Sequence, residues 1–129
     1  MDARVVLAED EEDIGNIVKA KLEHAKIRVT WKKNGIDAWK AIVAERPALA
    51  ILDVDMPGID GFEVLRRIKE AEDTQHIPVI MLTAQGHEAY VGNAMRHGAS
   101  DYVVKPFQPA DVLARVLRLL GQPTAKAAG

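Results

Sequence analysis

The feature that most constrains this sequence is an uninterrupted apolar run at residues 48–52 that ends in the carboxylate of Asp53. Two turn signals follow at once, Pro57-Gly58 and Asp60-Gly61. An apolar run bounded by turn residues is typical of a strand buried on both faces. Ligands of open parallel sheets bind outside the carboxyl ends of the strands. The sequence therefore places Asp53 where a functional acid is expected, and an acid that only caps a loop is the alternative.

Apolar or alternating runs predict four further strands, and a helical pattern follows each strand. The predicted strands are residues 5–8, 27–31, 48–53, 78–82 and 101–104. Five alternations of strand and helix indicate one α/β domain, a doubly wound parallel sheet with helices on both faces. We expect this domain to span residues 1–121, followed by a flexible C-terminal tail at 122–129.

The sequence gives a clear start for the third predicted helix but only a weak apolar pattern for the fourth. Asp60 lies three residues before Glu63, which predicts a capping box at the start of the third helix. The helix over residues 85–97 has few apolar side chains to bury and contains glycine, so we expect it to open most easily. Its candidates for burial are Ala89, Val91, Ala94 and Met95.

Composition excludes several classes of protein. The 129 residues include no cysteine, which rules out disulfides and thiolate metal sites. The 17 basic and 19 acidic residues give a net charge of -2, so we expect no direct nucleic acid binding. No apolar run approaches the ~20 residues of a membrane span, and no signal peptide is apparent. We expect a cytoplasmic protein without membrane insertion. Its histidines, which lack the spacing of metal ligands, are expected on the surface: His24, His76, His87 and His97.

Polar side chains follow four of the predicted strands. These are Glu9, Asp10, Asp53, Thr83 and Lys105. Carboxylates within ~4–6 Å of one another repel by about 1 kcal/mol per pair in water and by more when partly buried. A divalent cation would relieve this repulsion, and a few oxygen ligands suit Mg²⁺ better than Ca²⁺. The added ammonium and hydroxyl are the groups that a phosphoryl group needs around it.

Four segments carry a resemblance to a known family. They read VVLAED at 5–10, LDVDMPGIDG at 52–61, VIMLTA at 79–84 and GASDYVVKPF at 98–107. In this order and spacing they resemble the receiver domain of two-component response regulators, in particular single-domain, chemotaxis-regulator-like receivers. The resemblance extends from about residue 4 to residue 120. It implies a flavodoxin-like fold with five helices and the strand order 2-1-3-4-5.

The resemblance also implies roles for individual residues. Asp53 would be the phosphoacceptor, and Glu9, Asp10, Asp53 and the backbone carbonyl of Asp55 would bind Mg²⁺. Thr83 and Lys105 would hold the phosphoryl oxygens, and Tyr102 would act with Thr83 in the switch, with packing as the alternative for Tyr102. The Lys105-Pro106 bond would be cis. The side chains of Asp55 and Gln85 would tune the rate of hydrolysis, or else be merely solvated.

The same resemblance implies the partners. The phosphodonor would be a sensor histidine kinase or a histidine phosphotransfer protein, and a downstream protein target would bind the face formed by the fourth helix, fifth strand and fifth helix. Asp101, Asp111 and Arg115 suit a dimer network on that face. The fourth helix offers only one basic residue, Arg96, so we expect a monomer or a weak dimer.

Two rival interpretations remain open from the sequence. Asp53-Val54-Asp55 also begins the signature of haloacid dehalogenase-type phosphatases, in which Asp53 would be the nucleophile and Asp55 the general acid. Pro57 stands where that signature needs Thr or Val, and the metal acids precede the nucleophile. An unphosphorylated interaction scaffold is the second rival, but it would not need this set of acids with Thr83 and Lys105.

Overall fold

The computed structural model describes residues 3–86 and 88–121, so the predicted tail and His87 lie outside the described residues. Ten elements alternate along the chain: β1 (Arg4–Ala8), α1 (Glu12–His24), β2 (Arg28–Lys32), α2 (Gly35–Glu45), β3 (Leu49–Asp53), α3 (Gly61–Glu70), β4 (Val79–Ala84), α4 (Glu88–Arg96), β5 (Asp101–Lys105) and α5 (Pro109–Leu119). The strands are all parallel and lie in the order β2-β1-β3-β4-β5. The predicted fold class and strand order are confirmed.

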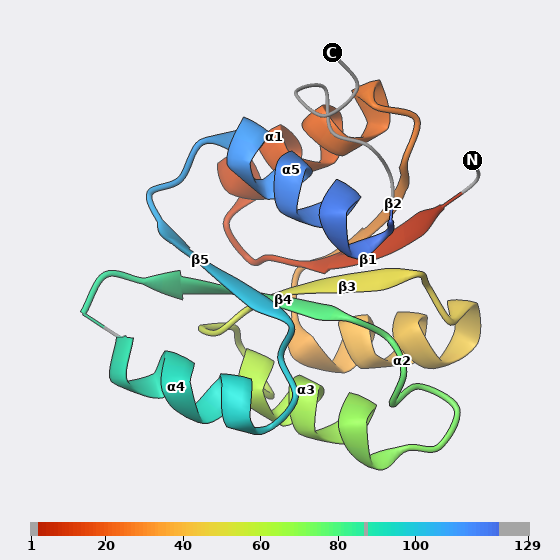
Figure 1. Cartoon of the computed structure of the whole chain (residues 1–129), viewed down its shortest axis with the longest axis vertical. Coiled ribbons are helices and arrows are strands. Elements are labelled where there is room, and N and C mark those ends of the chain that lie inside the picture. The colour runs from red at the N-terminus through yellow and green to blue at the C-terminus, as the bar shows by residue number, and fades with distance from the viewer. Residues whose placement is uncertain (1–2, 87, 122–129) are drawn as a thin grey trace.

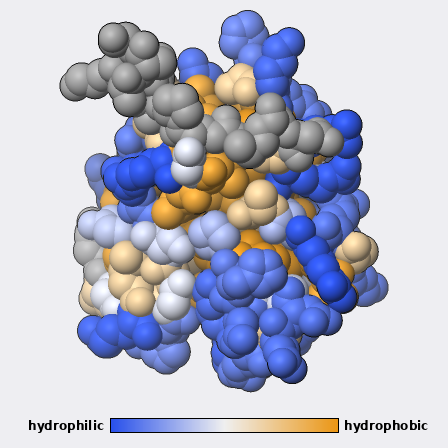
Figure 2. Space-filling model, turned by 45° about the vertical axis from the view of Figure 1, so that its right-hand side comes forward, coloured by the Kyte–Doolittle hydropathy of each residue, from blue (hydrophilic) through white to orange (hydrophobic). Residues whose placement is uncertain are grey.

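The helices cover the sheet on both faces, with α1 and α5 on one side and α2, α3 and α4 on the other (Figure 1). Each face has its own apolar cluster, because side chains of successive strand residues point to opposite sides. All five residues of β3 are buried, as expected for the central strand of a doubly wound sheet. The outer surface is largely hydrophilic in the view of Figure 2, with apolar surface gathered in its middle.

The start of α3 determines how the chain leaves the end of β3. Asp60 accepts a hydrogen bond from the backbone N–H of Glu63 at 2.9 Å, which confirms the N-cap half of the predicted capping box. In place of the reciprocal bond, the Glu63 carboxylate accepts hydrogen bonds from Arg66 and Arg67. The residue after Asp60, Gly61, packs against the end of β3. A Cβ atom there would lie 2.3 Å from the carbonyl oxygen of Asp53, so this close approach requires glycine.

Some predicted core positions are wrong. In α4, Val91 and Ala94 are buried as predicted, but Ala89 is exposed and Met95 is 40 % exposed. Ala89 and Met95 lie toward solvent, and Tyr90 of the same helix contacts the ring of Phe62 in α3, with 6.3 Å between ring centroids.

In α1 the apolar residues recur at helical spacing, which predicts one buried face made of Ile14, Ile17, Val18 and Leu22. Of these, Ile17 is 51 % exposed.

Other expectations of the sequence are met. The Lys105-Pro106 peptide bond is cis. Three of the four histidines are exposed: His24, His76 and His97. Within the described ranges, none of the helices combines the length and the apolar character that crossing a membrane requires.

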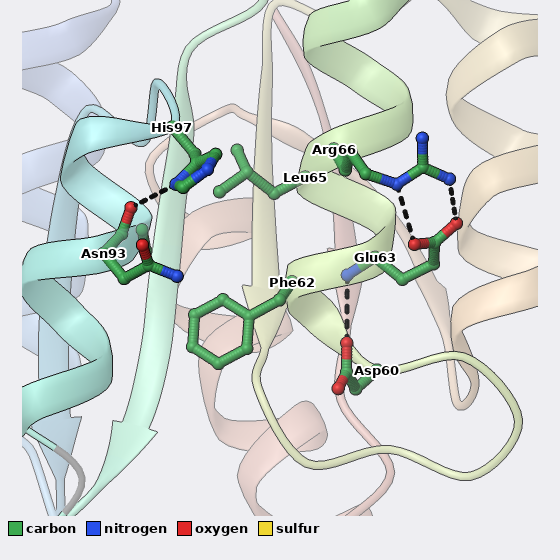
Figure 3. Close-up of a pocket in the computed structure, with 8 residues that line it drawn as sticks. Asp60, Phe62, Glu63, Leu65, Arg66, Asn93 and His97 are labelled. Atoms are coloured by element: carbon green, nitrogen blue, oxygen red, sulfur yellow. Dashed lines mark hydrogen bonds and ion pairs between the residues drawn. The ribbon is translucent and has the colours of Figure 1, made fainter.

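A cavity of about 350 Å³ lies between α3 and α4 (Figure 3), and its lining includes none of the acids predicted to bind a metal. Its polar lining residues bond largely to neighbours on their own helix. Glu63 pairs with Arg66, and His97 Nδ1 lies 2.7 Å from the carbonyl oxygen of Asn93. Arg66 and Arg67 lower the pKa of Glu63 to about 2. These contacts engage several of the polar lining groups, while Phe62, Leu65 and Ala94 give the cavity an apolar part.

Candidate functional site

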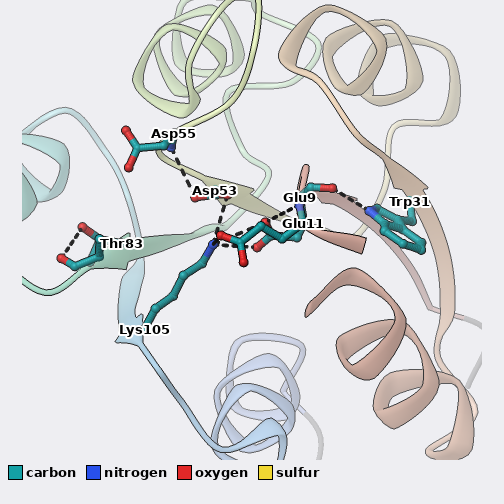
Figure 4. A network of polar contacts seen from close by, with 8 residues as sticks. Glu9, Glu11, Trp31, Asp53, Asp55, Thr83 and Lys105 are labelled. Carbon is teal, nitrogen blue, oxygen red and sulfur yellow. Dashed lines mark hydrogen bonds and ion pairs between the residues drawn. The ribbon is translucent and has the colours of Figure 1, made fainter. Parts of the chain in front are cut away.

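The predicted site residues converge at the carboxyl edge of the sheet (Figure 4). Glu9 comes directly after β1, Asp53 is the last residue of β3, and Lys105 is the last residue of β5. Because all strands run in the same direction, these ends meet at one edge. These side chains therefore come together because of the parallel pairing of the strands, and not because they are close in the sequence.

The three acids predicted to bind a metal lie together. Glu9, Asp10 and Asp53 each offer a carboxylate oxygen, and these oxygens lie within 4.8 Å of one another. Glu9 is fully buried and Asp53 is 3 % exposed, whereas Asp10 is exposed. The cluster is thus buried on one side and open to solvent on the other.

Lys105 is the counter-charge of this cluster. Its Nζ lies 3.0 Å from Oε1 of Glu9 and 3.1 Å from Oδ2 of Asp53. A weaker contact of 3.8 Å reaches Oε1 of Glu11. Burial acts to lower the pKa of Lys105, but its bonds to Glu9 and Asp53 outweigh burial and raise the pKa above its usual range. The ammonium is therefore charged at neutral pH.

Asp53 titrates far from the usual range of a carboxyl group. Burial, and after it the neighbouring Glu9 carboxyl group, raise the pKa of Asp53 to about 8, although Lys105 opposes the shift. Charging a second carboxylate beside Glu9 is unfavourable with only one cation present. A further positive charge beside Asp53 would favour its ionised form and lower its pKa.

The donor set fits a hard divalent cation. Glu9 Oε1 is buried and accepts no hydrogen bond from the described part of the chain, although the Lys105 ammonium lies close to it. Lys105 already contacts this buried oxygen as one cation, and a second cation would further lower the cost of burying it. Three acids that offer only oxygen, with an open side for water, match the preference of Mg²⁺.

The structure places the remaining predicted residues on β4, on β5 and in the segments that follow β3 and β4. Thr83 is buried, and its hydroxyl lies 3.5 Å from the carbonyl oxygen of Ala84, a weak contact. Asp55 donates its backbone N–H to Oδ1 of Asp53 at 3.2 Å, while its carboxylate points away from Lys105 (Figure 4). Gln85 is exposed just beyond β4. Tyr102, on the edge strand β5, is 38 % exposed.

Two contacts were missing from the sequence prediction. The backbone N–H of Glu11 donates to Oε2 of Glu9 at 3.1 Å, and the indole Nε1 of Trp31 donates to the carbonyl oxygen of Glu9 at 2.8 Å. The pairing of β1 with β2 could have indicated the second contact, because Trp31 lies opposite Leu7, close to the end of β1. The direction of the indole could not be read from the sequence.

Comparison with known proteins agrees with this geometry. Residues 5–117 match the family model of the response regulator receiver domain. The transcriptional regulatory protein AfsQ1 of Streptomyces coelicolor is 40 % identical over 116 residues, which are 90 % of this chain and 50 % of AfsQ1. The phosphate regulon transcriptional regulatory protein PhoB of Rhizobium meliloti is 36 % identical over 117 residues, 91 % of this chain and 52 % of PhoB. The chain spans about half the length of the curated relatives it matches.

Solved structures show the same relationship. The chemotaxis response regulator CheY4 of Vibrio cholerae superimposes with a TM-score of 0.86 at 27 % identity, over 92 % of this chain and 99 % of that one. The receiver domain of the Francisella response regulator 1452 also gives 0.86 at 27 % identity, over 93 % and 98 %. Nothing in these matches supports the phosphatase interpretation. With strand order, motif spacing and family model in agreement, this chain belongs to the receiver-domain family of two-component response regulators.

Proposed function

We propose that this chain accepts a phosphoryl group on Asp53 from a phosphohistidine of a sensor histidine kinase or a histidine phosphotransfer protein. One observation carries the proposal, the 3.1 Å ion pair between Lys105 Nζ and Asp53 Oδ2 at the carboxyl edge of the sheet. A fixed ammonium beside the acceptor oxygen would neutralise charge on the incoming phosphoryl group. We place this reaction in the cytoplasm and expect a monomer or a weak dimer.

The acidic cluster would hold Mg²⁺ for this reaction. The ligands would be Glu9, Asp10 and Asp53, together with the backbone carbonyl of Asp55. When bound, Mg²⁺ supplies positive charge that lowers the repulsion between these carboxylates and the phosphoryl oxygens. The raised pKa of Asp53 supports this assignment, because burial and the neighbouring Glu9 carboxyl group both disfavour the charged form of Asp53, which a bound cation would favour.

In the transfer step, an oxygen of Asp53 forms a bond to phosphorus while the phosphorus–nitrogen bond to the donor imidazole breaks. An ionised carboxylate has no proton to lose, so no general base is needed. Lys105 would stay within contact distance of the acceptor oxygen. The Thr83 hydroxyl, whose contact with a carbonyl oxygen among the described residues is long at 3.5 Å, would turn toward the new oxygens. Slow hydrolysis by water would return the acid.

The phosphorylated product carries about two negative charges at a buried strand end. Thr83 would follow the new oxygens, and the chain after β4 would follow Thr83. Tyr102, 38 % exposed on β5, would then turn inward. The face formed by α4, β5 and α5 would change shape and bind a downstream protein target. The exposed side chains of Asp55 and Gln85 would tune how fast water reaches the phosphoryl group.

The first step is tested by incubating the protein with Mg²⁺ and acetyl phosphate or phosphoramidate, followed by intact-mass measurement. We expect a gain of one phosphoryl group in the wild type and none in Asp53→Asn. Asp60→Asn is the matched control, since it alters another acid of the same segment but keeps a good helix cap, and it should be phosphorylated normally.

A wild-type protein without mass gain, or an Asp53→Asn variant that gains as much as the wild type, would contradict the proposal. Sustained turnover of a phosphomonoester would also contradict it, because a receiver takes up a single phosphoryl group and loses it slowly.

A further inference from the structure

We infer that Trp31 is a positioning residue for the metal site, because its indole N–H holds the backbone of Glu9 in place. This inference rests on the proposed binding of Mg²⁺ by the acidic cluster. Its basis is the 2.8 Å hydrogen bond from Trp31 Nε1 to the carbonyl oxygen of Glu9, which Figure 4 shows at the end of β1. Trp31 itself contacts no substrate and would act only through Glu9.

The end of β2 fixes the backbone of Glu9 twice. The N–H of Glu9 donates to the carbonyl oxygen of Lys32 at 3.0 Å, which is the last step of the ladder between β1 and β2. The strand β2 ends at Lys32, and the chain bends at residues 33–34 before α2. The indole of Trp31 then supplies the donor for the Glu9 carbonyl oxygen. Both backbone groups of this buried acid are therefore satisfied, as burial requires.

The indole ring is itself confined. It lies so close to α1 that a Cβ atom on Gly15 would come within 2.0 Å of Cζ2 and 2.7 Å of Nε1 of Trp31. On the ring, Lys33 Nζ lies 5.4 Å from the centroid, and the same ammonium contacts Glu12 at 3.3 Å. The ring thus has a fixed orientation, and its N–H is aimed at one acceptor.

Glu9 needs such an anchor more than an aspartate would. A glutamate side chain has one more rotatable bond than aspartate, so its oxygens have more positions available to them. Here the backbone is fixed by Lys32 and Trp31, and Oε2 accepts a bond from the N–H of Glu11. These restraints keep the carboxylate beside Asp53. Groups that orient a metal ligand commonly change metal affinity by about 10- to 100-fold when removed.

The inference is tested with Trp31→Phe, which keeps an aromatic ring beside Gly15 but removes the indole N–H. Mg²⁺ affinity is measured by isothermal titration calorimetry, and melting temperatures are measured in chelator and in saturating Mg²⁺. We expect Trp31→Phe to weaken Mg²⁺ binding by about tenfold. The matched control is Trp39→Phe in α2, where the other tryptophan packs against the opposite apolar cluster and should bind Mg²⁺ as the wild type does.

A merely structural role would lower the melting temperature of Trp31→Phe equally in chelator and in Mg²⁺. That result, with unchanged Mg²⁺ affinity, would overturn the inference and leave the proposed function intact. A wild-type protein that binds no Mg²⁺ would overturn both.

A second measurement leaves Trp31 unaltered, in case Trp31→Phe fails to fold. In Trp39→Phe, Trp31 is the sole tryptophan, so its fluorescence reports on this contact alone. We expect a saturable change in emission as Mg²⁺ is added, with the midpoint of the calorimetric titration. Emission that stays constant through saturation would count against the inference.

Discussion

At the scale of single residues, the pKa of Asp53 is set by its burial and by the charged side chains around it. Asp53 is 3 % exposed, and burial together with Glu9 raises its pKa to about 8, against the opposing effect of Lys105. Near neutral pH without metal, much of the protein therefore carries a proton on the acceptor. Mg²⁺ and this proton compete for the same oxygens, so metal binding should release a proton and tighten as the pH rises toward 8.

The stability of the metal-free protein should depend on pH through this group. The folded-state pKa of about 8 lies above the ordinary value of 3.8, so between these values the folded state binds more protons than the unfolded state. The contribution of Asp53 to the free energy of unfolding then falls as the pH rises from about 4 to about 8 and levels off above that. Urea unfolding in chelator across this range should show the decline.

Asp53→Asn is the control for this pH dependence, because it cannot ionise. Its unfolding free energy should lack the part of the slope assigned to Asp53. Equal slopes in variant and wild type would show that other groups cause the decline.

The residues of the site could be predicted where strand ends decide their position. Glu9, Asp53 and Lys105 each follow an apolar run, and parallel strands bring such positions together whatever the loops do. Glu11 and Trp31 escaped prediction because their contacts depend on a backbone turn and on a side-chain rotamer. Neither leaves a periodic signal in the sequence.

At the scale of elements, α3 and α4 differ in how firmly each is attached. The helix α3 begins with the Asp60 cap and buries Val64, Leu65 and Ile68 against the sheet. In α4 only Val91 and Ala94 are buried among the described side chains. Apolar burial is the main source of helix stability in a protein, so α4 should open at lower cost than α3. The glycines in and beside α4 predicted from the sequence that this helix opens easily. The sequence did not predict that Met95 and Ala89 face solvent.

Removing the cap of α3 provides a measurable test at this scale. Asp60→Ala deletes the acceptor of the Glu63 N–H and should lower the free energy of unfolding by about 1 kcal/mol in urea denaturation. Asp60→Asn should remain close to the wild type, because asparagine caps equally well. An alanine variant as stable as the wild type would show that water replaces the cap without loss.

At the scale of the whole molecule, the alternation of five strands and five helices was sufficient to predict the layers. The order of the strands was implied by family resemblance and not by periodicity, since an apolar run does not reveal which strand lies beside it. The sheet order β2-β1-β3-β4-β5 nevertheless explains the site, because it places β1 and β3 side by side at the centre. Core positions of helices were less predictable, as Ile17 illustrates, because the width of the buried stripe depends on the neighbouring helix.

The global stability of the molecule should report the crowding of acids at the sheet edge. Asp10→Asn removes one of three clustered carboxylates, so in chelator it should raise the free energy of unfolding by up to about 1 kcal/mol. In Mg²⁺ the order should reverse, because the wild type gains stability from the bound ion and the variant gains much less. Thermal melts with and without Mg²⁺ measure both effects. A lower melting temperature for Asp10→Asn in chelator would contradict the crowding of charges.

The strand β5 has a charged residue at each end, and the two ends are anchored in different places. Lys105 reaches into the acids, while Asp101 accepts bonds from Arg115 at 2.7 Å and Arg118 at 2.6 Å, both on α5. The two anchored ends of β5 lie roughly 13 Å apart along the strand. Because both ends are held by ion pairs, a shift of β5 along its own axis would displace both sets of partners together. A change at the acidic cluster would in this way reach α5.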